Sequence, residues 1–167
     1  MDFKTLADQY RNELLDNVLP FWLEHSQDLE FGGYFSCLDR EGKVFDTDKF
    51  IWLQGREVWM FSMLYNKVEK RQEWLDCAVQ GGGFLKKYGH NGDYNWYFSL
   101  NRSGRPLVEP YNIFSYTFAT MAFGQLSLAT GSQEYADIAK KTFEIILSKV
   151  DNPKGKWNKL HPDTRNL

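Results

Sequence analysis

The sequence predicts an all-α fold in which pairs of helices are separated by short β-hairpins. The first observation is an internal repeat, because the segment 34–43 returns at 97–105 with one residue deleted. The second observation is that 72–78 and 133–139 resemble each other at a similar spacing of about 60 residues. Two such similarities in the same order indicate a unit of hairpin, inner helix and outer helix that occurs twice.

The first expected helix precedes these units and runs from about Phe3 to Glu24. Apolar residues recur there at the period of one helix face. They are Leu6, Tyr10, Leu14, Val18 and Phe21. A second helix is expected after the segment 46–48, Asp-Thr-Asp, because short polar side chains favour a helix N-cap.

The later helices are bounded by glycine, proline and capping residues. We expect a third helix over 72–88 and a fourth over about 112–130, each followed by a glycine. A fifth is expected over 132–150, ended by Asp-Asn-Pro at 151–153. The three glycines at 81–83 fall inside the third helix and lack the pattern of a phosphate-binding loop, so we expect them to allow close helix contacts.

The hairpins are predicted by turn residues between alternating apolar and polar positions. The two turns are Asp-Arg-Glu-Gly at 39–42 and Asn-Arg-Ser-Gly at 101–104. Helix pairs that repeat in this way must bury their apolar faces on neighbouring pairs, which gives an open solenoid or a closed α/α toroid. The repeat alone favours neither. A closed ring of six units would need about 380 residues, whereas this chain has 167.

The composition excludes several classes of protein. Hydrophobic residues make up 43% and aromatic residues 17%, which suits one domain with a core. The net charge is −2 and the basic residues form no run, so no nucleic-acid partner is expected. No apolar stretch of membrane-span or signal-peptide length is found, so we expect a soluble cytoplasmic protein with no membrane partner. Cys37 and Cys77 are expected to be reduced thiols.

One charged residue falls on an otherwise apolar helix face. Trp52, Arg56 and Trp59 are spaced so that their side chains project from the same face. In the second unit the position of Arg56 is taken by Phe118. Since an arginine is rarely buried without a partner, two interpretations are open. One is a structural salt bridge, to Glu57 or to an acid on a neighbouring helix, and the other is a cation directed into a central cavity.

The segment that contains this arginine resembles a known family. Residues 49–60, Lys-Phe-Ile-Trp-Leu-Gln-Gly-Arg-Glu-Val-Trp-Met, are similar to the signature of the N-acylglucosamine 2-epimerases, a family that includes the renin-binding protein. The resemblance continues through 82–85, 102–106 and 113–115 and so covers essentially the whole chain. It implies an (α/α)6 toroid, of which 1–167 would be the N-terminal part, a single incomplete domain.

The resemblance also implies an activity. Family members interconvert N-acylglucosamine and N-acylmannosamine by removing and returning the proton at C2 of the open-chain sugar. Such an inversion needs proton donors and acceptors on both faces and a positive group near the developing oxyanion. By resemblance Arg56 supplies the positive group, and Trp52, Gln54, Trp59 and Ser115 line the substrate pocket. The expected partner is an amino sugar, and a homodimer is kept as an option.

The catalytic acid and base of the family are two histidines, and His25, His90 and His161 do not match them. We therefore expect the pair beyond residue 167 and expect this part alone to be inactive. No metal is expected, because no two histidines share a ligand spacing. No other cofactor is expected, although ATP acts as an effector in some members. The alternatives are a related sugar isomerase or disaccharide 2-epimerase, and a non-catalytic helical-repeat binding module.

Overall fold

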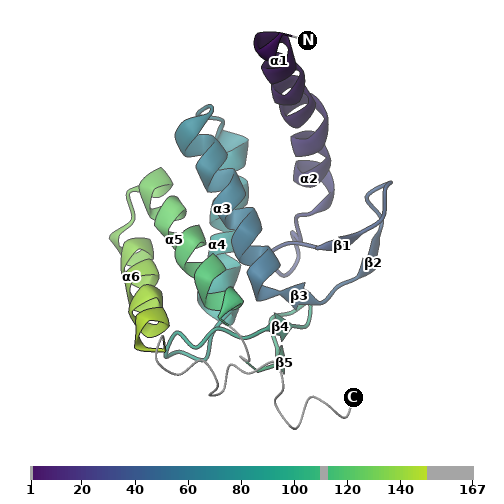
Figure 1. Ribbon diagram of the computed structural model, residues 1–167. Coiled ribbons are helices and arrows are strands. Elements are labelled where there is room, and N and C mark those ends of the chain that lie inside the picture. Colours follow the sequence, from purple (N-terminus) through teal and green to yellow (C-terminus); the bar gives the residue numbers. More distant parts are fainter. Residues whose placement is uncertain (1, 110–112, 150–167) are drawn as a thin grey trace.

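The computed structural model describes residues 2–109 and 113–149, in which two similar units follow an N-terminal helical segment (Figure 1). The first unit comprises β1 (Cys37–Leu38), β2 (Val44–Asp46), α3 (Ile51–Lys67) and α4 (Gln72–Tyr88). The second comprises β4 (Ser99–Leu100), β5 (Pro106–Val108), α5 (Phe114–Thr130) and α6 (Gln133–Ser148). The inner helices α3 and α5 have 17 residues each, and the outer helices α4 and α6 have 17 and 16. The repeat predicted from the sequence is therefore confirmed.

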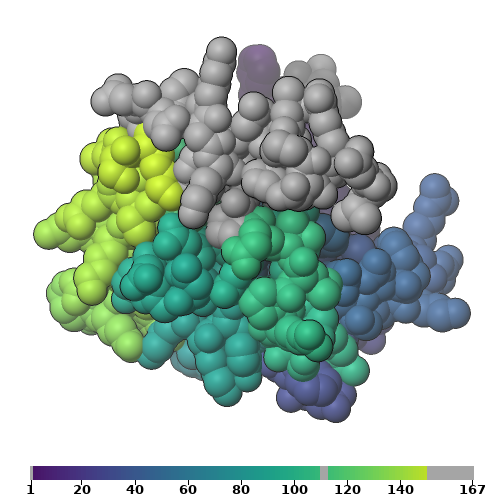
Figure 2. Space-filling model, turned by 90° about the horizontal axis from the view of Figure 1, so that it is seen from below, coloured from purple at the N-terminus to yellow at the C-terminus, as the bar shows by residue number. Residues whose placement is uncertain are grey.

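The helices pack in the order that the repeat predicts. α3 and α5 pack against each other, while α4 packs on α3 and α6 packs on α5. α3 and α5 run in one direction, and the strands lie at the end where these two helices begin (Figure 1). Figure 2 shows this end, with the first hairpin, in blue, projecting at one side of the second unit, in teal and green. α3 and α5 thus lie side by side, and each has its own partner helix, α4 or α6, packed against it.

The two hairpins share one turn design. Asp39 and Asn101 each accept hydrogen bonds from main-chain N–H groups of their own turn, at Lys43 and Arg105, both over 2.8 Å. The glycine that follows has a left-handed φ in both turns, +83° at Gly42 and +93° at Gly104. An aromatic ring packs directly under each glycine and leaves no room for a Cβ atom. This ring belongs to His25 in the first unit and to Tyr88 in the second.

The start of α3 differs from the prediction. Lys49 and Phe50 form a further strand, β3 (Lys49–Phe50), which pairs with β4 and creates a three-stranded sheet in the order β3-β4-β5. The helix therefore begins at Ile51, with Phe50 as its N-cap residue. The expected cap at 46–48 is wrong, because the Asp46 carboxylate accepts the N–H of Asp48 within the turn instead.

The N-terminal segment is helical throughout, as predicted. It consists of α1 (Phe3–Glu13), a π-helical stretch η1 (Leu14–Val18) and α2 (Leu19–His25). Its predicted apolar face is largely open, since Phe3 is 88% and Tyr10 70% exposed. Figure 1 shows why: α1 extends beyond the other helices and meets none of them along its length. Only Leu19 of this segment is buried.

The glycines of α4 act as the sequence predicts at two of three positions. A Cβ atom at Gly81 would lie 2.2 Å from the Tyr34 hydroxyl, and one at Gly82 would lie 2.3 Å from a methyl group of Leu126. Both therefore allow close packing. At Gly83 no atom lies within 4 Å of such a Cβ, so this glycine serves no contact with the described residues.

The predicted boundary between the last two helices is confirmed. α5 ends at Thr130, before Gly131, which has a φ of +71°, and α6 starts after Ser132, whose hydroxyl accepts the N–H of Tyr135 over 3.5 Å. The predicted stop at 150–153 and His161 lie outside the described residues.

Candidate functional site

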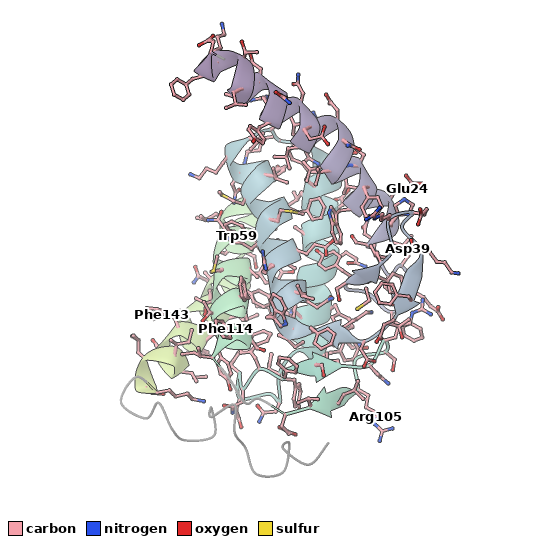
Figure 3. The ribbon with its side chains drawn as sticks, turned by 45° about the vertical axis from the view of Figure 1, so that its right-hand side comes forward. Glu24, Asp39, Trp59, Arg105, Phe114 and Phe143 are labelled. Carbon is pink, nitrogen blue, oxygen red and sulfur yellow. The ribbon has the colours of Figure 1, made fainter. Side chains whose placement is uncertain are left out.

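The face of α3 that carries Trp52, Arg56 and Trp59 lies at the surface rather than in the core. Arg56 is exposed, and Trp52 and Trp59 are partly exposed, whereas the buried face of α3 is carried by other residues. These are Ile51, Gln54, Gly55, Val58, Phe61, Ser62 and Leu64. Phe114 is exposed on the adjacent α5. Figure 3 shows Trp59 and Phe114 on the side of the helices away from the first hairpin, which bears Asp39.

Arg56 is held between two aromatic rings. Its guanidinium carbon lies 5.7 Å from the centre of the Trp52 ring and 5.6 Å from that of Phe118 on α5. These distances are in the range of cation–π contacts. Within residues 2–109 and 113–149 no ion pair joins Arg56 to a carboxylate. The salt-bridge interpretation of this residue therefore finds no partner in the described part, where the contacts of the guanidinium are with these two rings.

Glu57, the suggested partner of Arg56, points to the opposite side of α3. Its Oε1 lies 2.5 Å from the Ser26 hydroxyl, which is also 2.6 Å from the main-chain oxygen of Trp22. The Trp22 oxygen can only accept, and a hydroxyl has one hydrogen to donate. We infer that Ser26 donates to Trp22 and that Glu57 is protonated and donates to Ser26.

The surroundings of Glu57 agree with a neutral carboxyl group. Burial raises the pKa of Glu57 to about 8. The titratable neighbours are Tyr34 and Cys77, and burial raises the pKa of each of them as well. Among the described residues no ion pair joins Glu57 to a cation that would compensate a negative charge, so the carboxyl group stays protonated at neutral pH.

Gln54 has a structural function in this fold. Its side-chain oxygen accepts the N–H of Tyr34, and its amide group donates to the Tyr34 oxygen, each over 2.8 Å. Gln54 is fully buried. The prediction that Gln54 binds substrate is not supported by these contacts, because both ends of its amide are already used. The Tyr34 hydroxyl in turn donates to the main-chain oxygen of Cys77. The main chain of Tyr34 is thus bound to α3 and its side chain to α4.

Ser115 does not share the exposed face with Arg56. It lies in the first turn of α5 and is 2% exposed, whereas Phe114 beside it is half exposed. Of the five predicted site residues, the structure thus brings together Trp52 and Arg56 directly and places Trp59 on the same helix face. It separates Gln54 and Ser115 from them by burial.

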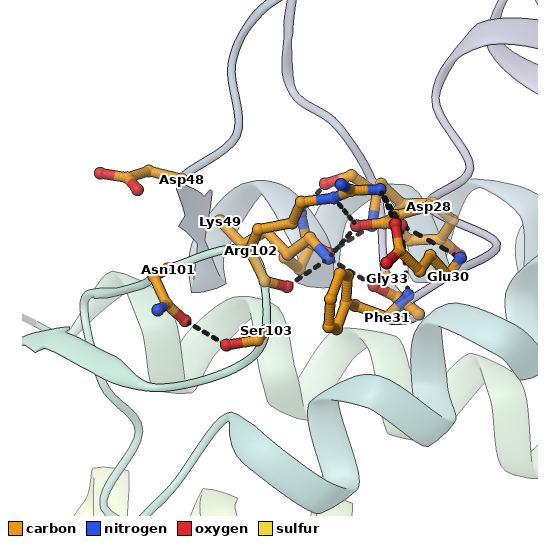
Figure 4. Close-up of polar contacts among 12 residues, drawn as sticks. Asp28, Glu30, Phe31, Gly33, Asp48, Lys49, Asn101, Arg102 and Ser103 are labelled. Carbon is orange, nitrogen blue, oxygen red and sulfur yellow. Dashed lines mark hydrogen bonds and ion pairs between the residues drawn. The ribbon is translucent and has the colours of Figure 1, made fainter.

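A buried ionic cluster was not found by sequence reasoning. The Lys49 ammonium group, 0% exposed, donates to Asp28 over 2.9 Å and to the main-chain oxygens of Gly32 and Arg102. Arg102 donates to both carboxylate oxygens of Asp28, over 2.9 and 3.1 Å, and pairs with Glu30 (Figure 4). This cluster joins the loop before β1 to the turn of the second hairpin.

The electrostatic balance of this cluster favours the charged forms. Burial by itself raises the pKa of Asp28, but the hydrogen bonds from Arg102 and Lys49 outweigh it and lower that pKa to about 2. Burial lowers the pKa of Lys49, and Asp28 opposes the change. All three Lys49 hydrogens have acceptors, so the buried part of the cluster is a structural support.

The two described histidines have packing functions. His25 lies under Gly42, and His90 stacks on Tyr94 with ring centres 4.7 Å apart. The Nδ1 atom of His90 accepts the N–H of Gly92, and burial lowers the pKa of this imidazole. Among the described residues no group of three His, Cys, Asp or Glu side chains could hold a metal ion. No helix in the same part of the chain is long and apolar enough to cross a membrane.

Repeated units of hairpin and antiparallel helix pair fit an open solenoid or a closed α/α toroid, and comparison with solved structures decides between them. The solved structure of cellobiose 2-epimerase from Bacillus thermoamylovorans B4167 matches with a TM-score of 0.79 and 28% identity, over 87% of this chain and 38% of that one. The predicted fold class, the N-terminal part of an (α/α)6 toroid, is thereby confirmed. The chain belongs to the N-acylglucosamine 2-epimerase family, whose model matches residues 33–166.

Curated relatives carry two different names. The N-acylglucosamine 2-epimerase of Mus musculus is 44% identical over 146 residues, which are 84% of this chain and 35% of that protein. The cellobiose 2-epimerase of Dictyoglomus turgidum is 28% identical over 167 residues, 95% of this chain and 42% of that protein. The chain therefore spans about a third of the length of the N-acylglucosamine 2-epimerase of Mus musculus.

Proposed function

We propose that the protein containing this chain is a sugar 2-epimerase that interconverts N-acylglucosamine and N-acylmannosamine. The observation that carries the proposal is the 44% identity to N-acylglucosamine 2-epimerase over 84% of the chain, against 28% for cellobiose 2-epimerase. Reaction at C2 is common to both names, and the difference in identity favours the amino sugar over the disaccharide.

In this proposal Arg56 stabilises the oxyanion that forms when the C2 proton is removed. The proton is acidified by the C1 carbonyl, and its loss places negative charge on the carbonyl oxygen. A guanidinium with free, fixed donors is suited to such a planar anion. Trp52 and Trp59 lie on the same face of α3 and offer ring surfaces to the apolar faces of a sugar.

The proton donor and acceptor come from elsewhere in the protein. His25 is packed against Gly42 and His90 against Tyr94. A catalytic base must reach a substrate carbon, and neither imidazole is placed to do so. We expect the two histidines of the family to lie beyond residue 167. Proton exchange at C2 consumes no cofactor, so none is part of the proposal. An effect of ATP and a homodimer also remain open to direct measurement.

A cytoplasmic location is part of the same proposal. Cys37 and Cys77 are both free thiols, and unpaired cysteines are usual in a reducing compartment. Fractionation of the cells that make the protein, followed by activity measurement in the soluble fraction, tests the location.

The test of the activity uses the full-length protein with the substitution Arg56→Ala. We expect kcat for conversion of N-acetylglucosamine to fall by about a hundredfold, the usual loss of one oxyanion donor, with a smaller change in KM. The matched control is Arg71→Ala, because Arg71 also lies over a tryptophan ring, that of Trp74, at 4.8 Å. Arg71 precedes α4, away from the strands, so its replacement should leave kcat unchanged.

Parallel assays with cellobiose distinguish the two substrates. Conversion of cellobiose in preference to the amino sugar would assign the protein to the disaccharide branch. Absence of turnover with both sugars would favour the non-catalytic binding module. An Arg56→Ala variant with unchanged kcat would remove Arg56 from the mechanism.

A further inference from the structure

Phe118 occupies a place that the sequence did not assign to the site. It lies on α5, yet its ring centre is 6.1 Å from that of Trp52 on α3 and 5.6 Å from the guanidinium carbon of Arg56. Trp52 and Phe118 thus contact each other as well as the cation. Arg56 is flanked by one ring from its own helix and one from the neighbouring helix.

The contact is fixed by the main chains of the two helices. A Cβ atom at Gly55, next to Arg56, would lie 2.9 Å from the carbonyl carbon of Phe118 and 3.0 Å from its oxygen. Such distances leave no room for a side chain at position 55. α3 and α5 therefore meet at Gly55 and Phe118, and this close approach sets the Phe118 ring against the next residue of α3.

The core between the helices does not depend on the Phe118 ring. Ala119, Ala122 and Phe123 of α5 are fully buried and pack with Val58 and Phe61 of α3 in the same core cluster. Phe118 is only partly buried and is not among the buried residues of this cluster. A role in stability alone would not explain why its ring faces a charged side chain.

We propose that Phe118 is a positioning residue for Arg56, and this inference rests on the proposed function. A long arginine side chain at the surface samples many rotamers, and ordering it costs conformational entropy. Two flanking rings restrict the guanidinium through cation–π attraction while they take none of its N–H donors. The cation is thus held in place before the oxyanion forms, which is the arrangement that makes such donors effective.

The experiment is a double-mutant cycle in the full-length enzyme with the variants Phe118→Leu, Arg56→Ala and the two together. We expect Phe118→Leu to lower kcat by about two- to tenfold, the range of a cation–π contact, with KM little changed. Phe118→Trp, which keeps a ring over the cation, should retain most of the activity. In the Arg56→Ala background, Phe118→Leu should cause no further loss, because the residue acts through Arg56.

Controls separate positioning from stability. Thermal melting should show each variant folded, and Phe143→Leu, the same change on α6, should leave kcat unchanged. Equal losses from Phe118→Leu with and without Arg56 would overturn the inference, as would full activity of Phe118→Leu. If Arg56→Ala is impaired and Phe118→Leu is not, the inference fails and the proposed function stands. If Arg56→Ala keeps its kcat, the proposed role of Arg56 fails, and any loss from Phe118→Leu is then independent of Arg56.

Discussion

Buried ionisable side chains are accommodated in two ways in this chain. Asp28 keeps its charge because Lys49 and Arg102 surround it, whereas Glu57 shares its neighbourhood with neutral groups and is kept protonated by burial. The first arrangement stores stability that depends on a complete set of partners. The second depends on the absence of charge. The stability that Glu57 contributes is therefore lost as the pH rises, whereas that of Asp28 is lost as the pH falls.

Replacing Asp28 by Asn should destabilise the protein by about 3–5 kcal/mol, because it leaves Lys49 buried without a counter-charge. Urea unfolding at pH 7 measures this loss. The exposed pair of Arg71 and Glu69 is the control, and Glu69→Gln should cost less than about 1 kcal/mol. A similar cost for both variants would contradict the structural importance of the cluster.

The same carboxylate predicts an acid limit. The folded-state pKa of Asp28 is depressed to about 2 from its ordinary value near 3.8, so its contribution is present above pH 4. It should be lost as the pH falls from about 4 to 2. The Asp28→Asn variant should lack this loss, and a melting temperature that falls equally in both proteins over that range would contradict the assignment.

Glu57→Gln should raise the melting temperature in alkaline but not in acidic solution. The folded-state pKa of Glu57 is raised to about 8, so its contribution is complete below about pH 4.5 and is lost as the pH rises toward 8. A glutamine amide can donate to Ser26 without titrating. We expect a gain of about 1–3 kcal/mol at pH 8.5 and little difference at pH 5. Parallel pH profiles of the two proteins would show that Glu57 is ionised in the folded state.

Only part of the candidate site could be predicted from the sequence. Arg56 was found because it breaks an apolar helix face, a signal that one segment carries by itself. The contacts of Gln54 could not be predicted, because its partner, the main chain of Tyr34, lies 20 residues away and has no side-chain signature. Asp28 and Arg102 are 74 residues apart, and periodicity gives no information on pairs that only the fold brings together.

At the scale of elements, repeats and helix ends were predictable and pairing between units was not. Glycine and polar caps bound α4, α5 and α6 within a residue or two of the expected positions, because these signals are local. β3 was missed because Lys49 and Phe50 become a strand only through pairing with β4, in the next unit. The same pairing moved the start of α3 away from its expected cap.

The glycines of α4 offer a matched pair of variants. Gly81→Ala should destabilise the protein by about 1–3 kcal/mol, since the new methyl group meets the Tyr34 hydroxyl and breaks its bond to Cys77. Gly83→Ala, two residues further along, meets no described atom and should stabilise the helix by about 0.5–1 kcal/mol. Thermal unfolding of both variants measures the difference, and a Gly81→Ala variant as stable as Gly83→Ala would contradict it.

At the scale of the whole molecule, apolar side chains are exposed on α1 and on α6, the first and last helices that the structure describes. Phe3 and Tyr10 lie open on α1, while Phe143 and Leu147 on α6 are 49% and 54% exposed. Exposed rows of this kind are typical of repeat proteins whose neighbouring repeats are missing. The N-acylglucosamine 2-epimerase of Mus musculus is longer, since this chain covers 35% of it.

Residues 1–167 made alone should therefore associate and lack epimerase activity. Light scattering should show species larger than a monomer, and Leu147→Glu on α6 should reduce them. An assay with N-acetylglucosamine should show no turnover, because neither His25 nor His90 is placed to exchange a C2 proton. An active monomer would contradict both expectations.

The strand β3 also determines where this protein can be divided into modules. By sequence β3 belongs to the first unit, but it pairs with β4 of the second, and the salt bridge of Asp28 with Arg102 crosses the same boundary. A cut at 68–71 between α3 and α4 and a cut between α4 and β4 both separate β3 from β4 and Asp28 from Arg102. Exchange of repeats between relatives should therefore be tolerated better when 28–50 and 99–108 are exchanged together than when either segment is exchanged alone.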